Sequence, residues 1–292
     1  MNPSFRLAIA MLAISTAACG RSEDTAAAVA TPTVTLARTE AAIGSPLEMT
    51  YKFEVAPDAP AFAEDYWVFV HFLDADGELM WTDDHQPPTP TRQWKPGQTI
   101  EYQRTMFVPK FPYTGQTLVE LGLFSRQTNQ RVPMKGDTRG QRAYQVAAFD
   151  LAAQDDNQFV IFRDGWHPTE VADDEVGTEW QWSKKQGTLT FRNPKRDVTV
   201  YLQVDRPVAG FPEDQHVEVR IGETVVDSFA LKPKQVALRK FRVKAAQLGR
   251  GDTVEMKVVV DRTFVPATIP ELKSSDPRDL GVRVFRAYID SR

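Results

Sequence analysis

Two groups of side chains in this sequence have the types and spacing to do chemistry, and the first is a carboxylate–imidazole cluster. It comprises Asp83-Asp84-His85, with His71 a short distance upstream. Carboxylates suit hard cations and imidazole suits zinc. However, Asp83 and Asp84 are adjacent and point to opposite sides of an extended chain. We therefore interpret Asp84 and His85 as part of a hydrogen-bond network that fixes a loop, or as ligand-binding candidates, and we predict no metal site.

The second group is a set of tryptophans. Five of the six stand beside polar residues near predicted loops: Trp81, Trp94, Trp166, Trp180 and Trp182. Sugar rings stack on exposed aromatic faces, while Asp, Asn and Arg hydrogen-bond the hydroxyls. The alternative is that these side chains fill the core, as aromatic residues commonly do. Trp180 and Trp182 share one face of a strand, which makes them either a core pair or a binding platform.

A polar segment near the C-terminus, residues 274–283 (SSDPRDLGVR), is a further candidate. Asp276 can cap a turn there, and Arg278 can pair with a neighbouring aspartate. The favoured interpretation is a structural corner. The alternative is a recognition loop, because loops on rigid sandwiches often carry function.

The sequence contains no motif that indicates catalysis. There is no Gly-x-Ser-x-Gly elbow, and the single cysteine, Cys19, stands near the N-terminus. A net charge of −4 argues against a nucleic-acid partner, which would favour a basic face. We therefore predict a protein that is not an enzyme, with no catalytic residue and no cofactor.

The N-terminus has the pattern of a secretory signal over residues 1–18. A basic start is followed by the apolar run Leu7–Ile14, which is too short to span a membrane, and then by small residues. A buried N-terminal helix is the alternative. Cys19 is the only cysteine, so it cannot form a disulfide within the chain.

The stretch Thr16-Ala17-Ala18-Cys19 resembles a bacterial lipobox. This resemblance implies cleavage before Cys19, acylation of its thiol and anchoring to the membrane by lipid alone. The residue after the cysteine is Gly20 rather than aspartate, which implies the outer membrane, facing the periplasm. Residues 19–32 are polar and alanine-rich, and we expect a flexible tether there.

Two all-β domains are expected beyond the tether, at residues 33–150 and 158–292, with a linker at 151–157. Leu47–Val55 alternates apolar and polar residues, and Tyr66–Leu73 is a continuous apolar run. Asp74–Gly77 supplies the turn of a hairpin. The second domain repeats the pattern, with alternation in 198–204 and 254–260 and a helical turn at 245–248. Helical periodicity is otherwise missing, so we predict two antiparallel β-sandwiches, immunoglobulin-like or jelly-roll-like.

Several motifs then suggest a family. The first domain contains FVHFLDADG (69–77), WKPG (94–97), Gly122-Leu123-Phe124 and Arg131-Val132-Pro133. It resembles the immunoglobulin-like module found with bacterial membrane glycosyltransferases of the mannosyltransferase type. The second domain, with WQW (180–182) and SDPRDLGVRV (275–284), is similar to another sandwich module that accompanies cell-surface glycan machinery. The resemblance implies an accessory role and supplies no catalytic residue.

The function predicted from these patterns is that of a non-catalytic cell-envelope lipoprotein. Its sandwiches would bind glycan or assist the assembly of surface polysaccharide. The alternative is a scaffold lipoprotein that binds envelope proteins in a periplasmic complex. Glycan binding predicts the tryptophans in a polar groove, whereas scaffolding predicts a large apolar surface patch.

Overall fold

The computed structural model describes residues 26–154, 159–173, 178–206 and 213–291. The predicted signal segment, the lipidation site Cys19 and residues 155–157 of the predicted linker lie outside these ranges. Within them the chain is built from strands joined by turns and short 3₁₀ segments, which confirms the all-β prediction. No helix among the described residues is long and apolar enough to cross a membrane.

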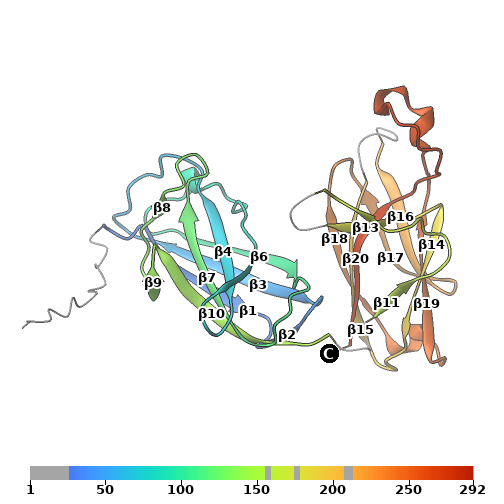
Figure 1. Cartoon of the computed structure of the whole chain (residues 1–292), viewed down its shortest axis with the longest axis horizontal. Coiled ribbons are helices and arrows are strands. Elements are labelled where there is room, and N and C mark those ends of the chain that lie inside the picture. The colour runs from blue at the N-terminus through green and yellow to red at the C-terminus, as the bar shows by residue number, and fades with distance from the viewer. Residues whose placement is uncertain (1–25, 155–158, 174–177, 207–212, 292) are drawn as a thin grey trace, which may run out of the picture.

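The first domain packs a three-stranded sheet, in the order β1-β3-β6, against a larger sheet in the order β2-β10-β7-β4-β5. The short strands β8 and β9 extend the larger sheet by pairing with β7 and β10 (Figure 1). The strands and the 3₁₀ segment η1 are β1 (Ala30–Leu36), β2 (Glu40–Ala42), β3 (Pro46–Val55), β4 (Trp67–Leu73), β5 (Leu79–Thr82), η1 (Thr91–Gln93), β6 (Thr99–Phe107), β7 (Gly115–Phe124), β8 (Arg131–Val132), β9 (Thr138–Gly140) and β10 (Ala143–Ala152).

The core of this domain follows from alternation along the strands. Side chains at every second position of β3 are buried, as the sequence predicts: Leu47, Met49, Tyr51, Phe53 and Val55. They meet the inner-face residues of β4 and β7 from the opposite sheet. Full burial of one such large side chain stabilises the fold by about 1.5–3 kcal/mol.

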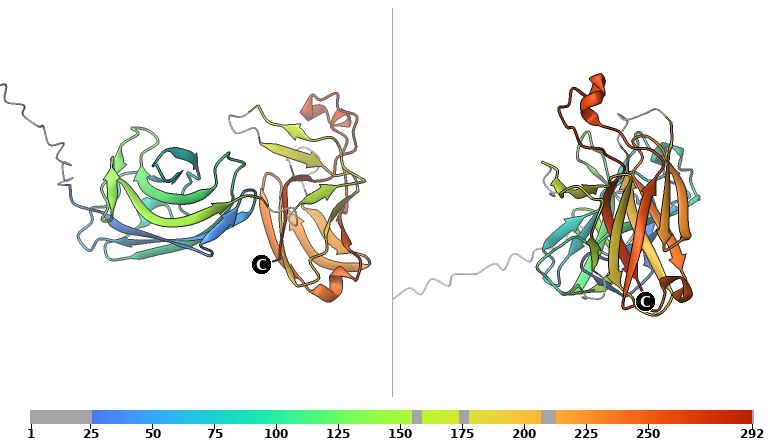
Figure 2. Two further views of the ribbon diagram at one scale, coloured as in Figure 1. Left: turned by 60° about the horizontal axis from the view of Figure 1, so that its bottom comes forward. Right: turned by 90° about the vertical axis from the view of Figure 1, so that its right-hand side faces the viewer.

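The second domain pairs two five-stranded sheets, in the orders β11-β14-β19-β16-β17 and β12-β13-β20-β15-β18. In Figure 2 the two domains lie side by side, and the segment bearing η4 and η5 projects from the second. The elements are β11 (Val160–Phe162), β12 (Glu170–Val171), β13 (Glu179–Trp182), β14 (Gln186–Arg192), β15 (Val198–Asp205), β16 (Gln215–Ile221), β17 (Thr224–Leu231), β18 (Ala237–Val243), η3 (Ala245–Leu248), β19 (Thr253–Val260), η4 (Pro266–Thr268), η5 (Pro270–Leu272) and β20 (Arg283–Asp290).

The expected helical turn at 245–248 is confirmed as η3, and it ends at Gly249 with a positive φ of 73°. The boundaries of the first domain differ from the expected ones. β1 begins at Ala30 rather than at residue 33, because Ala30 and Pro32 already pair with Val55 and Phe53 of β3. β10 continues to Ala152, inside the expected linker.

Polar contacts join the two domains. Arg38 forms an ion pair with the buried Asp290 at the end of β20. Glu48 of β3 accepts hydrogen bonds from the Tyr201 hydroxyl at 2.7 Å and from the Lys240 ammonium group at 2.5 Å. The three-stranded sheet of the first domain therefore contacts the sheet of the second domain that contains β15 and β18.

Candidate functional site

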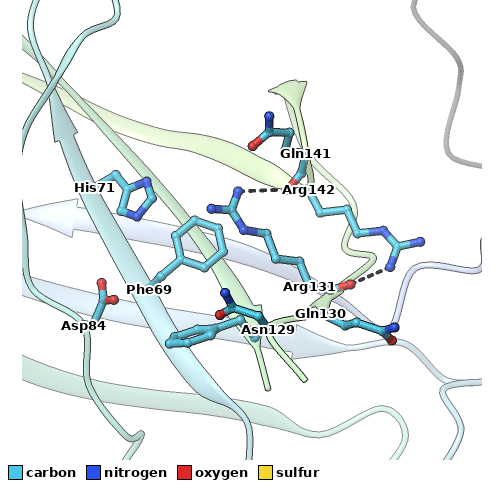
Figure 3. Close-up of a pocket in the computed structure, with 9 residues that line it drawn as sticks. Phe69, His71, Asp84, Asn129, Gln130, Arg131, Gln141 and Arg142 are labelled. Carbon is cyan, nitrogen blue, oxygen red and sulfur yellow. Dashed lines mark hydrogen bonds between the residues drawn. The ribbon is translucent and has the colours of Figure 1, made fainter. Parts of the chain in front are cut away.

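A concave polar site lies on the outer face of the larger sheet of the first domain. On β4, Val68, Val70 and Phe72 face the core, so the pleat turns Phe69 and His71 to the opposite side. Figure 3 shows the side chains that line the depression. Its volume is about 800 Å³. It is lined by Phe69, His71, Asp84, Phe124, Asn129, Gln130, Arg131, Gln141 and Arg142.

A glycine forms the floor of this site. Gly122 of β7 lies directly opposite Phe69 of β4, and a Cβ atom at position 122 would stand 2.3 Å from the Phe69 ring. With only hydrogen at that position, the ring can lie against the sheet. The Arg131 guanidinium then covers it, 4.1 Å from the ring centroid. Phe69 is consequently only 2% exposed, although it lies outside the sandwich core.

Backbone turns hold the arginine in place. Asn129, Gln141 and Arg142 all have positive φ, which bends the segments on either side of β8 and β9 over the sheet. The Arg131 Nη1 donates to the Gln141 carbonyl at 2.9 Å, and Arg142 donates to the Arg131 carbonyl (Figure 3). Arg131 is thus fixed both by the face of Phe69 and by the backbone.

Charges of both signs surround the depression. Burial lowers the pKa of His71, Arg131 lowers it further and Asp84 opposes the shift, so the imidazole is neutral at pH 7. Burial likewise lowers the pKa of Arg131, while Glu120 and Asp84 counteract this. The Asp84 carboxylate is anchored by the Val70 backbone N–H at 3.1 Å. The site can therefore offer amide, guanidinium, imidazole and carboxylate groups for hydrogen bonding to a neutral ligand.

His85 belongs to the core side of the same sheet edge and is only 5% exposed. Its Nδ1 donates to the Asp83 carbonyl and its Nε2 accepts from the Tyr102 hydroxyl, both at 2.8 Å. Asp83 pairs with Arg104 at 3.0 Å. The cluster is thus the predicted network that fixes a loop. The prediction of His85 as a ligand-binding residue is wrong, because both of its ring nitrogens are engaged inside the protein. No group of three or more His, Cys, Asp or Glu with metal-site geometry occurs in the described ranges.

The buried imidazole predicts a pH-dependent stability. Burial, aided by Arg104, lowers the pKa of His85 to about 4. Between pH 6.5 and 4 the His85 imidazole is protonated in the unfolded chain but stays neutral in the folded state. The free energy of unfolding should therefore fall across that window as the pH is lowered, by about 3 kcal/mol, and be fully retained above pH 6.5. Urea denaturation should show a shallower pH slope for His85→Gln than for the exposed control His216→Gln. Equal slopes would refute this assignment.

The tryptophan candidates do not converge on one groove. Trp94 and Trp182 are only 4% and 6% exposed, so the prediction of them as sugar-stacking residues is wrong, and they fill the interior instead. Trp81 stacks on Phe72 at 5.0 Å. Trp166 lies over Gly187 and donates to the Thr188 carbonyl at 2.8 Å. These two are half-buried and engaged with the core.

Asp276 and Arg278 form the predicted structural corner, and Trp180 packs beside it, against the small cluster that contains Trp182. The Arg278 guanidinium pairs with Asp276 at 2.7 Å and with Glu170 at 2.7 Å. Glu170 also accepts from Trp180 Nε1 at 3.2 Å. The Arg283 guanidinium lies 5.2 Å from the Trp180 ring centroid. The Asp276 carboxylate thus uses its hydrogen bonds within the 274–283 segment, and Arg278 in addition joins this segment to Glu170 of β12.

Of the predicted site residues, only Asp84 lines the depression. His71, grouped above with the Asp83-Asp84-His85 cluster, lines it as well. Sequence reasoning missed the other lining residues because they come from strands and turns far apart in the chain. One local signal was available, since the sequences that carry the family resemblance include Gly122-Leu123-Phe124 and begin another motif at Arg131. Phe69 and His71 also alternate with the core residues of a predicted strand.

No protein-family model matches the sequence, and no curated protein does either. Solved structures are similar in part. An alkylpurine DNA glycosylase of Pseudomonas fluorescens, bound to DNA with an abasic-site analog, is 12% identical with a TM-score of 0.25. The match covers 43% of this chain and only 31% of that one, so the chain spans about a third of its length.

Two carbohydrate-binding modules are also similar in part. The module from Cellvibrio mixtus lichenase 5A, solved with cellotriose, is 10% identical over 44% of this chain and 88% of that one, with a TM-score of 0.28. A β-1,3-glucan-binding module from Bacillus halodurans is 14% identical over 46% and 95%, with a TM-score of 0.26. At such scores these likenesses decide nothing about function. The resemblance to glycosyltransferase accessory modules stays a prediction.

Proposed function

We propose that this chain is a non-catalytic cell-envelope lipoprotein that binds a neutral saccharide in the depression on the first domain. The observation that carries the proposal is the fixed Arg131 guanidinium, held over Phe69 among amide and carboxylate side chains. Saccharide hydroxyls both donate and accept hydrogen bonds, so a site that offers both kinds of group suits them. A preorganised guanidinium loses little entropy on binding.

The charge of the site favours a neutral ligand over an acidic one. Arg131 and Arg142 contribute positive charge, and Asp84 at the rim contributes negative charge. The buried Glu120 lies on the same face, paired in register with His71, and acts electrostatically on Arg131. Because His71 is neutral, the two positive charges of the arginines and the two negative charges of Asp84 and Glu120 sum to zero. A carboxylate or phosphate ligand would gain from the arginines but would be opposed by both acids.

The lining residues also support binding rather than catalysis. Among its lining residues the depression has no serine, threonine, tyrosine, cysteine or lysine, so it offers none of the hydroxyl, thiol or amine nucleophiles of covalent catalysis. Half-buried Phe124 supplies an apolar surface beside the polar groups. Envelope location and anchoring at Cys19 belong to the proposal through the lipobox resemblance, as does assistance in surface polysaccharide assembly.

A glycan array tests this function. Full-length chain in detergent should bind neutral oligosaccharides above background and should bind uronic-acid and phosphorylated glycans of similar length more weakly. Strong selectivity for acidic glycans would contradict the neutral-ligand argument. Background signal across the whole array would refute saccharide binding and turn attention to the scaffold alternative, which crosslinking in native membranes would examine.

A further inference from the structure

A second polar depression lies on the outer face of the sheet β11-β14-β19-β16-β17 in the second domain. On β14, Leu189 and Phe191 face the core, which turns Thr188 and Thr190 outward. On β19 the same alternation turns Glu255 and Lys257 outward, beside those threonines in register. The resulting depression has a volume of about 690 Å³.

The side chains of Glu255 and Lys257 have no partner within the described part of the chain. Their two-residue separation alone does not explain this, because an acid–base pair with the same separation on a neighbouring strand does form an ion pair. Glu218 and Arg220 on β16 are also two residues apart on the outer face, and they form an ion pair at 2.6 Å. The side chains of Glu255 and Lys257 make neither a hydrogen bond nor an ion pair with any residue that the structure describes. Their carboxylate and ammonium groups are therefore available to an external ligand.

The rest of the depression is preorganised. The Arg163 Nε donates to Thr190 Oγ1 at 3.3 Å, which holds the guanidinium over the row of threonines. Arg163 and Lys257 are balanced by Asp164 and Glu255 among the lining residues, so this site too is neutral overall. It therefore presents hydroxyl, carboxylate, ammonium and guanidinium groups without a net charge that would select an ion.

An apolar rim lies beside these groups. Ile161 of the edge strand β11 stands opposite Thr190 and is 48% exposed. Phe159, two residues earlier, follows the same alternation and is equally exposed. A saccharide combines an apolar C–H face with hydroxyl groups, and it could place the first on this rim and the second over the row of threonines.

We infer that this face is a second saccharide site, which makes the chain bivalent toward a polysaccharide. The inference takes its ligand class from the proposed function but rests on a separate set of residues. Two sites on one chain convert the second binding event into an intramolecular one. A polysaccharide long enough to reach both sites should thus be bound much more tightly than a short oligosaccharide.

A pair of matched double variants tests the inference. Glu255→Gln with Lys257→Gln leaves the net charge unchanged, and Glu218→Gln with Arg220→Gln makes the same change on the adjacent strand outside the depression. Full-length chain in detergent would be titrated calorimetrically with mannohexaose, laminarihexaose and cellohexaose. Retention would be measured in gels cast with mannan, laminarin and hydroxyethylcellulose. The first double variant should lower the stoichiometry from two to one and weaken polymer retention by at least about tenfold. The control should match wild type.

The outcomes separate the two assignments. A wild-type stoichiometry of one, together with wild-type behaviour of the Glu255/Lys257 double variant, would overturn the second site and leave the first intact. Loss of all binding in Arg131→Ala would likewise overturn it. Conversely, an Arg131→Ala chain with unchanged binding, alongside a Glu255/Lys257 double variant with none, would support the second site and refute the first. Binding of no probe by wild type would contradict both.

Discussion

Arg131→Ala should weaken binding of a neutral oligosaccharide at the first-domain site by about 10–100-fold. The substitution removes a charged donor that is already held in place, and a hydrogen bond from such a group contributes about 1.5–3 kcal/mol. It also uncovers the Phe69 ring on which the guanidinium lies. Calorimetric titration measures the loss, and circular dichroism at the same temperature establishes that the sandwich is still folded.

Arg126→Ala is the matched control for this variant. Arg126 also lies over an aromatic ring of β4, 4.4 Å from the centroid of Trp67, but it does not line the depression. The Arg126→Ala variant should therefore bind saccharide with the same affinity as the wild type. Equal losses from both substitutions would show that the effect is a general one of removing charge from this face, and the assignment of Arg131 would fall.

Gly122→Ala should destabilise the first domain by about 3 kcal/mol and abolish its saccharide site. The added Cβ would stand 2.3 Å from the Phe69 ring and 2.7 Å from the Arg142 carbonyl, on a strand paired on both sides. Neither neighbour can move without displacing Arg131 or the turn that positions it. Urea denaturation measures the stability, and calorimetry measures the binding that remains in the folded state.

Two further variants define this result. Gly251→Ala adds a methyl group where the nearest atom beyond the adjoining residues is 3.4 Å away, and it should be nearly neutral. Adding Phe69→Leu to Gly122→Ala should recover part of the stability but not the binding, because the platform under Arg131 is gone. A Gly122→Ala chain as stable as wild type would show that the ring and the turn relax freely, contrary to the rigid floor inferred here.

The strands that alternate strongly could be predicted from the sequence. β15 and β19 match the expected segments 198–204 and 254–260 to within one residue, and β3 buries the expected face, because period-two alternation is a local property of the chain. The short strands β8 and β9 were not expected. They pair through two to three residues and depend on left-handed turns at Asn129 and Gln141, which the local sequence does not announce.

The binding site was harder to predict for the same reason. Its residues meet only because β4, β7 and the turns around β8 are adjacent in three dimensions. The tryptophans led to the opposite error, because residues that fill the interior were predicted as binding residues. A tryptophan near a turn can fill the interior or face solvent, and Trp182 is covered by Phe264 and Leu280, which both lie more than 80 residues later in the chain. The Asp276–Arg278 corner was predictable, since its partners are two residues apart.

Photo-crosslinking tests the central claim most directly, because it reports where a saccharide is bound. Diazirine-labelled mannohexaose, laminarihexaose and cellohexaose would be irradiated with full-length chain in detergent, and the adducts would be located by mass spectrometry. The proposed site predicts adducts at residues 124–131 and 141–142 that unlabelled hexasaccharide competes away and that Arg131→Ala abolishes. Competable adducts confined to the segments around Trp81, Trp166 or Trp180, with none near Arg131, would contradict it.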